Sequence, residues 1–150
     1  MRTFHNPKEL QAARGETLGS SDWVTIEQSR IDTFAEATGD HQWIHVDPDA
    51  AAKGPFGTTI AHGYLTLSLI PMLSWQTYSV EGAKMGVNYG LNKVRFPSPV
   101  PVGSKVRSTS VLSDVTEITG GLQLVVTATL EVEGGDKPVC VAETVSRLYF

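Results

Sequence analysis

Residues 37–45, with the sequence ATGDHQWIH, place a carboxylate and an imidazole five positions apart, at Asp40 and His45. Both residues follow the helix stop that we expect at Gly39, in a turn from which side chains can project into a cleft. A carboxylate that stays ionised and an imidazole that titrates near neutral pH are the groups that activation of a water molecule requires. The same spacing also fits a turn aspartate that caps local amides beside a surface histidine.

A metal site is the second chemistry that this segment could support. His41 and His45 are separated by four positions, as two zinc ligands on a helix would be, and Asp40 lies beside them. However, the flanking glycine and proline indicate a loop, and only Asp47 or the distant His62 could complete the ligand set. We therefore expect no metal, and we interpret His62 as a hydrogen-bonded structural histidine.

Residues 57–65, with the sequence GTTIAHGYL, form a second candidate constellation around Gly63. The backbone N–H of a residue that opens a helix has no acceptor within that helix, and the helix dipole favours negative charge there. Such an N–H could therefore bind a thioester carbonyl whose oxygen gains charge during a reaction. The glycine could instead merely allow close packing of the helix on a sheet. Ile60 and Tyr64 flank this opening and are candidate substrate contacts.

Basic residues are concentrated between positions 84 and 107, which hold five of the twelve in the chain. On a strand, Lys93 and Arg95 would share one face, as would Lys105 and Arg107. The phosphates of a carrier such as coenzyme A would bind such residues, so Lys93 and Arg95 are candidate substrate contacts. A solvated outer face of a sheet would explain the same pattern.

Short helices are predicted in the first half of the chain to position these groups. Residues 25–28, TIEQ, have the pattern of a capping box, and the amphipathic helix that follows should end at Gly39. Asp47 and Pro48 suit the cap and the first turn of a second short helix, which residues 53–55 should end.

A longer helix and a sheet are predicted in the rest of the chain. Residues 60–75 have no continuous polar face, so we expect a buried helix that Pro71 ends or kinks near its last turn. After Gly86 the apolar period changes from 3.6 to 2, which predicts strands at residues 87–96, 105–115, 122–133 and 139–150. We therefore expect a single α+β domain over residues 1–150, in which a long curved antiparallel sheet wraps around a central buried helix.

The bulk composition narrows the partners and the compartment. The net charge of −4 gives no support to nucleic acid as a partner. The single cysteine, Cys140, allows no internal disulfide. No apolar run approaches the roughly 18 residues of a membrane span, and the N-terminus lacks the pattern of a signal peptide. We expect a cytoplasmic protein with no membrane partner.

Three motifs occur in a fixed order, at residues 39–45, 61–63 and 94–100 with Gly103. Together they resemble the MaoC-like (R)-specific enoyl-CoA hydratases, and most closely the branch related to nodulation protein N. This resemblance covers the chain from about residue 21 to its end and implies the hot-dog fold. It also implies that Asp40 and His45 hold the water that is added syn to a trans-2-enoyl thioester, and that the Gly63 N–H binds the thioester carbonyl.

The same resemblance implies a homodimer whose sheets join edge to edge, and strands at 121–133 and 138–149 could supply the edges. It implies no cofactor beyond the coenzyme A or acyl carrier protein that carries the acyl group. Gln42 and Trp43 stand where the family often has Asn-Pro, and Trp43 could narrow or line the acyl pocket. A thioesterase on the same fold and a catalytically silent acyl-binding subunit remain alternatives.

Overall fold

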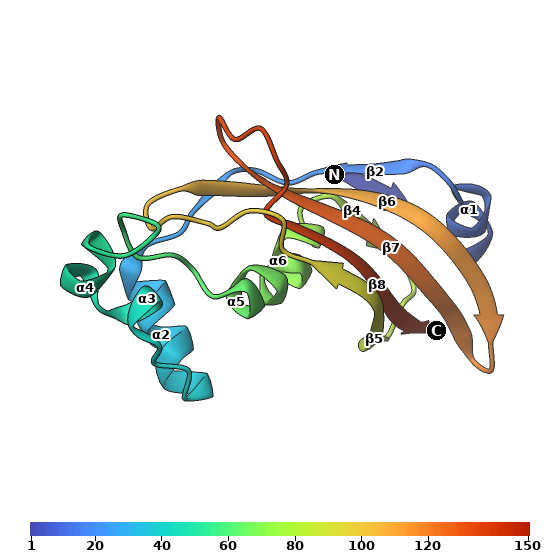
Figure 1. Cartoon of the computed structure of the whole chain (residues 1–150). Coiled ribbons are helices and arrows are strands. Elements are labelled where there is room, and N and C mark those ends of the chain that lie inside the picture. Colours follow the sequence, from blue (N-terminus) through green and yellow to red (C-terminus); the bar gives the residue numbers. More distant parts are fainter.

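The computed structural model describes residues 1–150, and its largest element is a curved antiparallel sheet (Figure 1). Four long strands build most of it: β5 (Met85–Arg95), β6 (Lys105–Ile118), β7 (Gly121–Val132) and β8 (Cys140–Tyr149). The short strands β2 (Thr17–Ser20) and β3 (Val24–Thr25) both pair with β6. The four predicted strands are confirmed, although β6 runs three residues beyond the expected end at residue 115.

The strand order is β2-β6-β7-β8-β5, which leaves β5 at a free edge of the sheet. The prediction that residues 121–133 and 138–149 offer exposed edges is wrong, because β7 lies between β6 and β8, and β8 lies between β7 and β5. β5 and β6 are consecutive in the chain but are joined by the proline-rich residues 96–104 rather than by a tight turn. This connection lets the last strand of the chain insert between β7 and β5.

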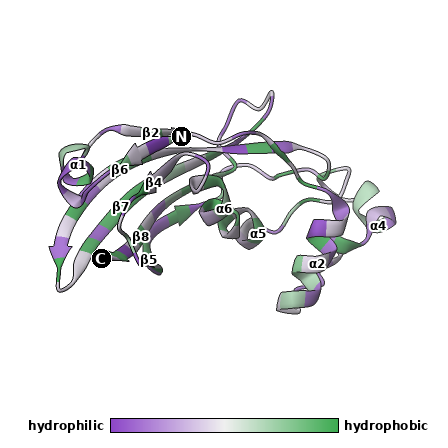
Figure 2. Cartoon of the chain, turned by 180° about the vertical axis from the view of Figure 1, so that it is seen from behind, coloured by the Kyte–Doolittle hydropathy of each residue, from purple (hydrophilic) through white to green (hydrophobic).

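Side chains alternate between the two faces of the long strands. Along β7, buried and partly exposed residues alternate with a period of two, as the sequence predicted. Figure 2 shows the same alternation of hydrophobic and hydrophilic residues along β6 and β7. The buried set faces the concave side of the sheet, where it contributes Val106, Ala128 and Leu130 to a main core of 14 buried residues.

Two short helices, α5 (Gly63–Ser68) and α6 (Ile70–Ser74), lie against the concave face of the sheet (Figure 1). Leu65 and Leu73 point into the main core. The helical segment begins at Gly63 rather than at residue 60. The predicted break near Pro71 is confirmed, because α5 ends at Ser68 and Pro71 lies in the first turn of α6, where no intrahelical hydrogen bond is lost. The helix is also not buried all round, since Tyr64 is 69% exposed and other residues of this outer face are uncovered.

Three further helices gather at one end of the sheet, namely α2 (Gln28–Thr38), α3 (Trp43–Val46) and α4 (Pro48–Ala52) (Figure 1). Gly39 ends α2 with a left-handed φ of 80°, and the Asp47 carboxylate accepts a hydrogen bond of 3.0 Å from the Ala50 N–H at the start of α4, so both predicted caps are confirmed. The predicted capping box is wrong. Thr25 belongs to β3 and pairs with Lys105, and α2 begins without a side-chain cap.

The N-terminal residues close the other end of the molecule. β1 (Arg2–Phe4) pairs in parallel with β4 (Tyr78–Val80), and α1 (Pro7–Ala12) packs into a second, smaller core of eight buried residues with the far ends of β6 and β7. No helix of the chain is both long enough and apolar enough to cross a membrane.

Candidate active site

His45 lies on α3, a single helical turn in the segment for which the sequence predicted a loop. The side chain is only 7% exposed, and its Nδ1 atom lies 2.7 Å from the carbonyl oxygen of Ile60. Because a carbonyl oxygen can only accept, Nδ1 carries the hydrogen and donates it. The Nε2 atom of the neutral ring is therefore left as an acceptor with a free lone pair.

Burial lowers the pKa of His45 below its ordinary value of 6.5, since the charged imidazolium would lose its hydration. The nearby His62 ring also lowers this pKa, whereas the Ile60 carbonyl and the Asp40 carboxylate raise it. The balance is a lowered pKa, so His45 is neutral at pH 7. A neutral imidazole is the form that can accept a proton or a hydrogen bond from water.

His62 immediately precedes α5 and stacks on His45, with the ring centroids 3.9 Å apart and the ring planes 25° apart. Its Nε2 atom donates a hydrogen bond of 2.9 Å to the backbone carbonyl of Asp40, and Phe34 packs against the ring, with 4.8 Å between the two centroids. Its Nδ1 atom is buried without a hydrogen-bond partner. The prediction of a hydrogen-bonded histidine is confirmed, but the ring also joins both members of the Asp40–His45 pair.

The Asp40 side chain is exposed and lies just beyond the end of α2. One carboxylate oxygen accepts a hydrogen bond of 3.3 Å from the Gln42 N–H, which holds the turn. The ligand atoms of Asp40, His45 and His62 all lie within 4.8 Å of one another. The structure thus brings the predicted pair together, at a separation that one water molecule can bridge.

Two histidines and a carboxylate are also a common zinc set, but their geometry here does not suit one ion. A zinc ion sits about 2.0–2.1 Å from a ring nitrogen, along a lone pair in the plane of that ring. The rings of His45 and His62 are stacked, so a single ion cannot lie close to both planes at that distance. Of the ligands that the sequence suggested, Asp40, His45 and His62 come together, whereas His41 is not in this cluster and lies 3.5 Å from the Glu36 carboxylate.

Gln28 holds the segment that carries His45. Its side-chain amide donates a hydrogen bond of 2.8 Å to the His45 carbonyl and another to Asp32, while its carbonyl accepts one from the Thr59 hydroxyl. This role of Gln28 was not predicted, because the residue belongs to the sequence pattern of a capping box. The sequence feature that could have indicated this role is the position of Gln28, a polar residue on the inner side of the first turn of α2.

Gly63 is the first residue of α5, as predicted, and the ring of Phe96 lies over it. A Cβ atom at this position would lie 3.0 Å from the Phe96 ring, so a larger residue here would require that ring to move by a few tenths of an ångström. Tyr64 packs edge-to-face on the same ring, with 6.2 Å between the centroids. Gly63 therefore packs closely on the side chain of Phe96, which follows β5 in the chain.

The remaining candidate contacts lie at different places. Gln42 and Trp43 are exposed, and the Trp43 ring packs closely over Gly54. The Ile60 side chain is buried, so the contribution of this residue to the site is its carbonyl group. Lys93 and Arg95 are exposed near the end of β5.

Two further basic residues of this stretch, Lys105 and Arg107, have partners on the outer face of the sheet. Lys105 lies 3.8 Å from the Glu133 carboxylate, and Arg107 lies 2.6 Å from that of Glu131 while stacking on Trp23. The interpretation as a solvated outer face therefore holds for Lys105 and Arg107.

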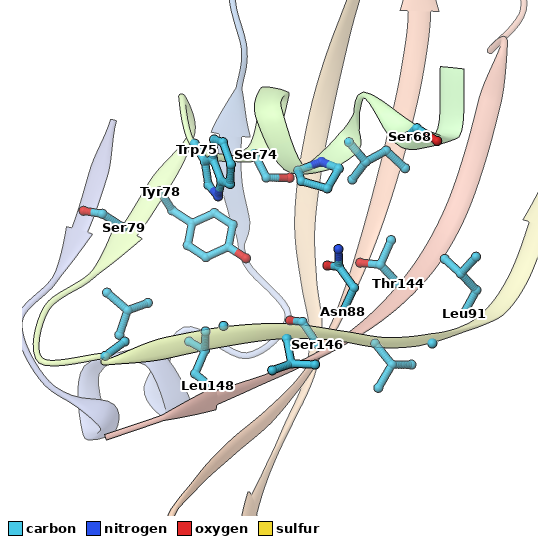
Figure 3. Close-up of a pocket in the computed structure, with 18 of the residues that line it drawn as sticks. Ser68, Ser74, Trp75, Tyr78, Ser79, Asn88, Leu91, Thr144, Ser146 and Leu148 are labelled. Atoms are coloured by element: carbon cyan, nitrogen blue, oxygen red, sulfur yellow. The ribbon is translucent and has the colours of Figure 1, made fainter. Parts of the chain in front are cut away.

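A cavity of about 760 Å³ lies between the α5–α6 pair and the floor formed by β4, β5 and β8 (Figure 3). Its lining begins at Leu67, just over one helical turn beyond Gly63, and extends along α6 to Tyr78 on β4. Asp40, His45 and Gly63 are not among the residues that line this cavity.

Known proteins are similar to this chain in sequence and in fold. The MaoC-like domain family matches residues 9–135. The 3-hydroxyacyl-thioester dehydratase Z of Mycobacterium tuberculosis strain H37Rv is 61% identical over 148 residues, which cover 98% of each chain. Nodulation protein N of Rhizobium leguminosarum bv. viciae is 46% identical, over 91% of this chain and 86% of its own.

Among solved structures, an (R)-hydratase of A. caviae involved in PHA biosynthesis has a TM-score of 0.74 at 24% identity, over 90% of this chain and 96% of that chain. The resemblance predicted from the three ordered motifs is confirmed. The chain belongs to the MaoC-like domain family and has its hot-dog fold.

Proposed function

We propose that this chain interconverts 3-hydroxyacyl thioesters and trans-2-enoyl thioesters as an (R)-specific hydratase and dehydratase. The observation that carries this proposal is the pair of acceptors, the Asp40 carboxylate and the Nε2 atom of neutral His45, in a cluster whose ligand atoms lie within 4.8 Å of one another. The name of the mycobacterial relative, 3-hydroxyacyl-thioester dehydratase Z, supports the same reaction.

One water molecule can donate one hydrogen bond to the Asp40 carboxylate and another to His45. A lone pair of its oxygen then remains free to attack the β carbon. Asp40 takes one proton of the water as the general base and then delivers it to the α carbon, while His45 accepts a hydrogen bond from the other hydrogen of the water and orients its oxygen. Because both fragments come from one water on one face, the addition is syn and gives a 3-hydroxyacyl thioester. Dehydration uses the same residues in reverse.

The backbone N–H of Gly63 is the group that we expect to bind the thioester carbonyl. This N–H, in the first turn of α5, has no acceptor within the helix. A hydrogen bond to the carbonyl oxygen would stabilise the negative charge that develops there and would draw electrons from the double bond. We further infer that the acyl tail enters the cavity beneath α5 and α6, and that Lys93 and Arg95 meet the phosphates of the carrier.

The direct test is the loss of enoyl absorbance with trans-2-enoyl-CoA substrates from short to long. Asp40→Asn and His45→Gln should each lower kcat by roughly 10²–10⁴-fold, the usual worth of general acid–base catalysis. Asp49→Asn and His41→Gln make the same chemical changes at exposed neighbouring positions and should keep near wild-type rates.

Three results would count against this function. Near-full activity in Asp40→Asn or His45→Gln would remove that residue from the reaction. Release of free thiol without loss of enoyl absorbance would identify a thioesterase instead. Binding of acyl-CoA without turnover at any chain length would identify a silent subunit.

We also propose a homodimer that forms through β5. This strand pairs only with β8, and four of its large apolar residues are between 39% and 57% exposed: Met85, Val87, Tyr89 and Leu91. An unpaired apolar edge strand is a template for pairing with a second copy. Light scattering should show a dimer that Leu91→Lys weakens, whereas Thr116→Lys, on a paired strand, should leave it intact. A monomeric wild-type protein would refute the homodimer.

A further inference from the structure

The cavity beneath α5 and α6 has apolar lining residues at both ends, including Trp75 and Leu148 near Tyr78, but its polar side chains differ from one end to the other. At the end nearer Gly63 it is lined by Leu67 and Leu91, and the two hydroxyl groups there are already engaged. Ser68 donates to the Tyr64 carbonyl at 2.6 Å, and Thr144 donates to the Val126 carbonyl at 3.0 Å. This end of the cavity therefore presents a mainly apolar surface to a bound chain.

The middle and far end carry polar groups that have no such partner. The side chains of Ser74, Tyr78, Asn88 and Ser146 line this part of the cavity and make no hydrogen bond within the chain. They come from four different elements, α6, β4, β5 and β8, and Figure 3 shows the Tyr78 hydroxyl and the Asn88 amide directed into the space between helix and sheet. Their convergence from separate elements distinguishes this set from polar residues scattered on a surface.

The position of the polar set defines which part of a substrate it would meet. Ser74 follows Gly63 by eleven residues and is the last residue of α6, beyond the break at Leu69. A thioester carbonyl held at the Gly63 N–H would place the reacting carbons at the Asp40–His45 pair and the distal part of a long acyl chain among these four side chains. A plain hydrocarbon tail would take water away from hydroxyl and amide groups without replacing their hydrogen bonds.

We propose that this cavity selects acyl thioesters that carry an oxygen substituent, a hydroxyl or a carbonyl group, on the distal part of the chain. The proposal rests on the proposed function. A distal oxygen can accept hydrogen bonds from the Tyr78 hydroxyl and the Asn88 amide, and a distal hydroxyl can also donate to the Asn88 carbonyl. The substrate class is thereby narrowed from fatty acyl thioesters in general to long, oxygenated ones.

The test compares three substrates on the wild-type protein. They are crotonyl-CoA, trans-2-dodecenoyl-CoA and 12-hydroxy-trans-2-dodecenoyl-CoA, and the readout is kcat/KM for hydration. We expect the hydroxylated chain to exceed the plain chain of the same length by about 10-fold or more, because a site built to hydrogen-bond a substrate group rejects the analogue that lacks it. The acyl chain of crotonyl-CoA is too short to reach the four polar side chains, so its rate reports the hydration reaction alone.

Variants locate the preference. Tyr78→Phe and Ser146→Ala remove single hydroxyl groups with little change in shape, and each should reduce the ratio between the two long substrates while leaving crotonyl-CoA hydration unchanged. Thr144→Val is the matched control, since the Thr144 hydroxyl is already bonded to the backbone, and it should leave the ratio unchanged.

Two failures can be told apart. If crotonyl-CoA is hydrated but the two long substrates react equally, or if the preference survives in both Tyr78→Phe and Ser146→Ala, the polar cavity does not select oxygenated chains and the hydratase function stands. If none of the three substrates is hydrated, the proposed function itself is overturned.

Discussion

Replacing His62 should move the acid limb of the pH–rate profile to higher pH. The His45 and His62 rings are stacked with their centroids 3.9 Å apart, so the His62 ring disfavours a positive charge on His45. After burial, this neighbour is a cause of the lowered pKa of His45. Because His45 must be neutral to accept a hydrogen bond from water, kcat/KM falls as the pH drops through that pKa.

Two variants separate the functions of the His62 ring. His62→Phe keeps a stacked ring of similar size but cannot donate to the Asp40 carbonyl, whereas His62→Gln keeps an N–H donor and loses the ring. Both remove the neighbour that opposes protonation of His45, so both should lose activity at a higher pH than the wild type. On the neutral plateau, His62→Phe also loses a hydrogen bond worth about 0.5–1.5 kcal/mol, which is roughly a 2- to 12-fold loss of rate if all of it supports the transition state.

The assay is the initial rate of enoyl-CoA hydration between about pH 5 and 8, reported as kcat/KM because this ratio follows the titration of the free enzyme. His41→Gln is the matched control, since His41 is exposed and faces Glu36, and its profile should coincide with that of the wild type. A purely structural His62 would lower rates without moving the limb. The reasoning is refuted if both His62 variants keep the wild-type acid limb.

Burial and protonation predict three further outcomes. Leu73→Ala empties a fully buried position of the main core and should lower the free energy of unfolding by about 2–5 kcal/mol in urea titrations; a loss well below this range would mean that the core refills the space. Because the pKa of His45 is lower in the folded state than its ordinary 6.5, the unfolded state takes up the proton first. The free energy of unfolding should therefore fall as the pH drops below 6.5 and through the folded-state pKa, and His45→Gln should flatten this dependence. Burial raises the pKa of the Cys140 thiol to about 11, so it should resist a disulfide-exchange reagent until urea unfolds the chain; equal reactivity in both states would contradict this.

Features with a local cause were predictable from the sequence. The caps at Gly39 and Asp47 depend on one residue and its nearest neighbours, and both are present. The alternation of apolar and polar residues along β7 depends only on which face of the strand is buried, and it predicted this strand correctly. The closeness of Asp40 and His45 was predictable for the same reason, since five residues at a helix end cannot separate two side chains widely.

Features that depend on competition between distant segments were not predictable. The capping pattern at residues 25–28 is present in the sequence, but Thr25 pairs with Lys105 of β6 instead, because a strand that joins an existing sheet gains backbone hydrogen bonds. The free edge at β5 depends on strand order, which alternation does not encode. The exposed outer face of α5 was not predictable either, because it depends on whether another element of the chain packs over that helix, and none does.

The chemical state of the candidate site is likewise a property of the fold. The two nitrogens of His45 differ only because the Ile60 carbonyl, fifteen residues away, accepts from Nδ1. That carbonyl is held in place because the Ile60 N–H donates to the Ile44 carbonyl and the Ala61 N–H donates to the Val100 carbonyl. The nitrogen that remains an acceptor is therefore fixed by backbone atoms that no motif names. A motif at residues 39–45 supplies the groups, but the packing of residues 59–62 against them decides which nitrogen accepts and at what pH it does so.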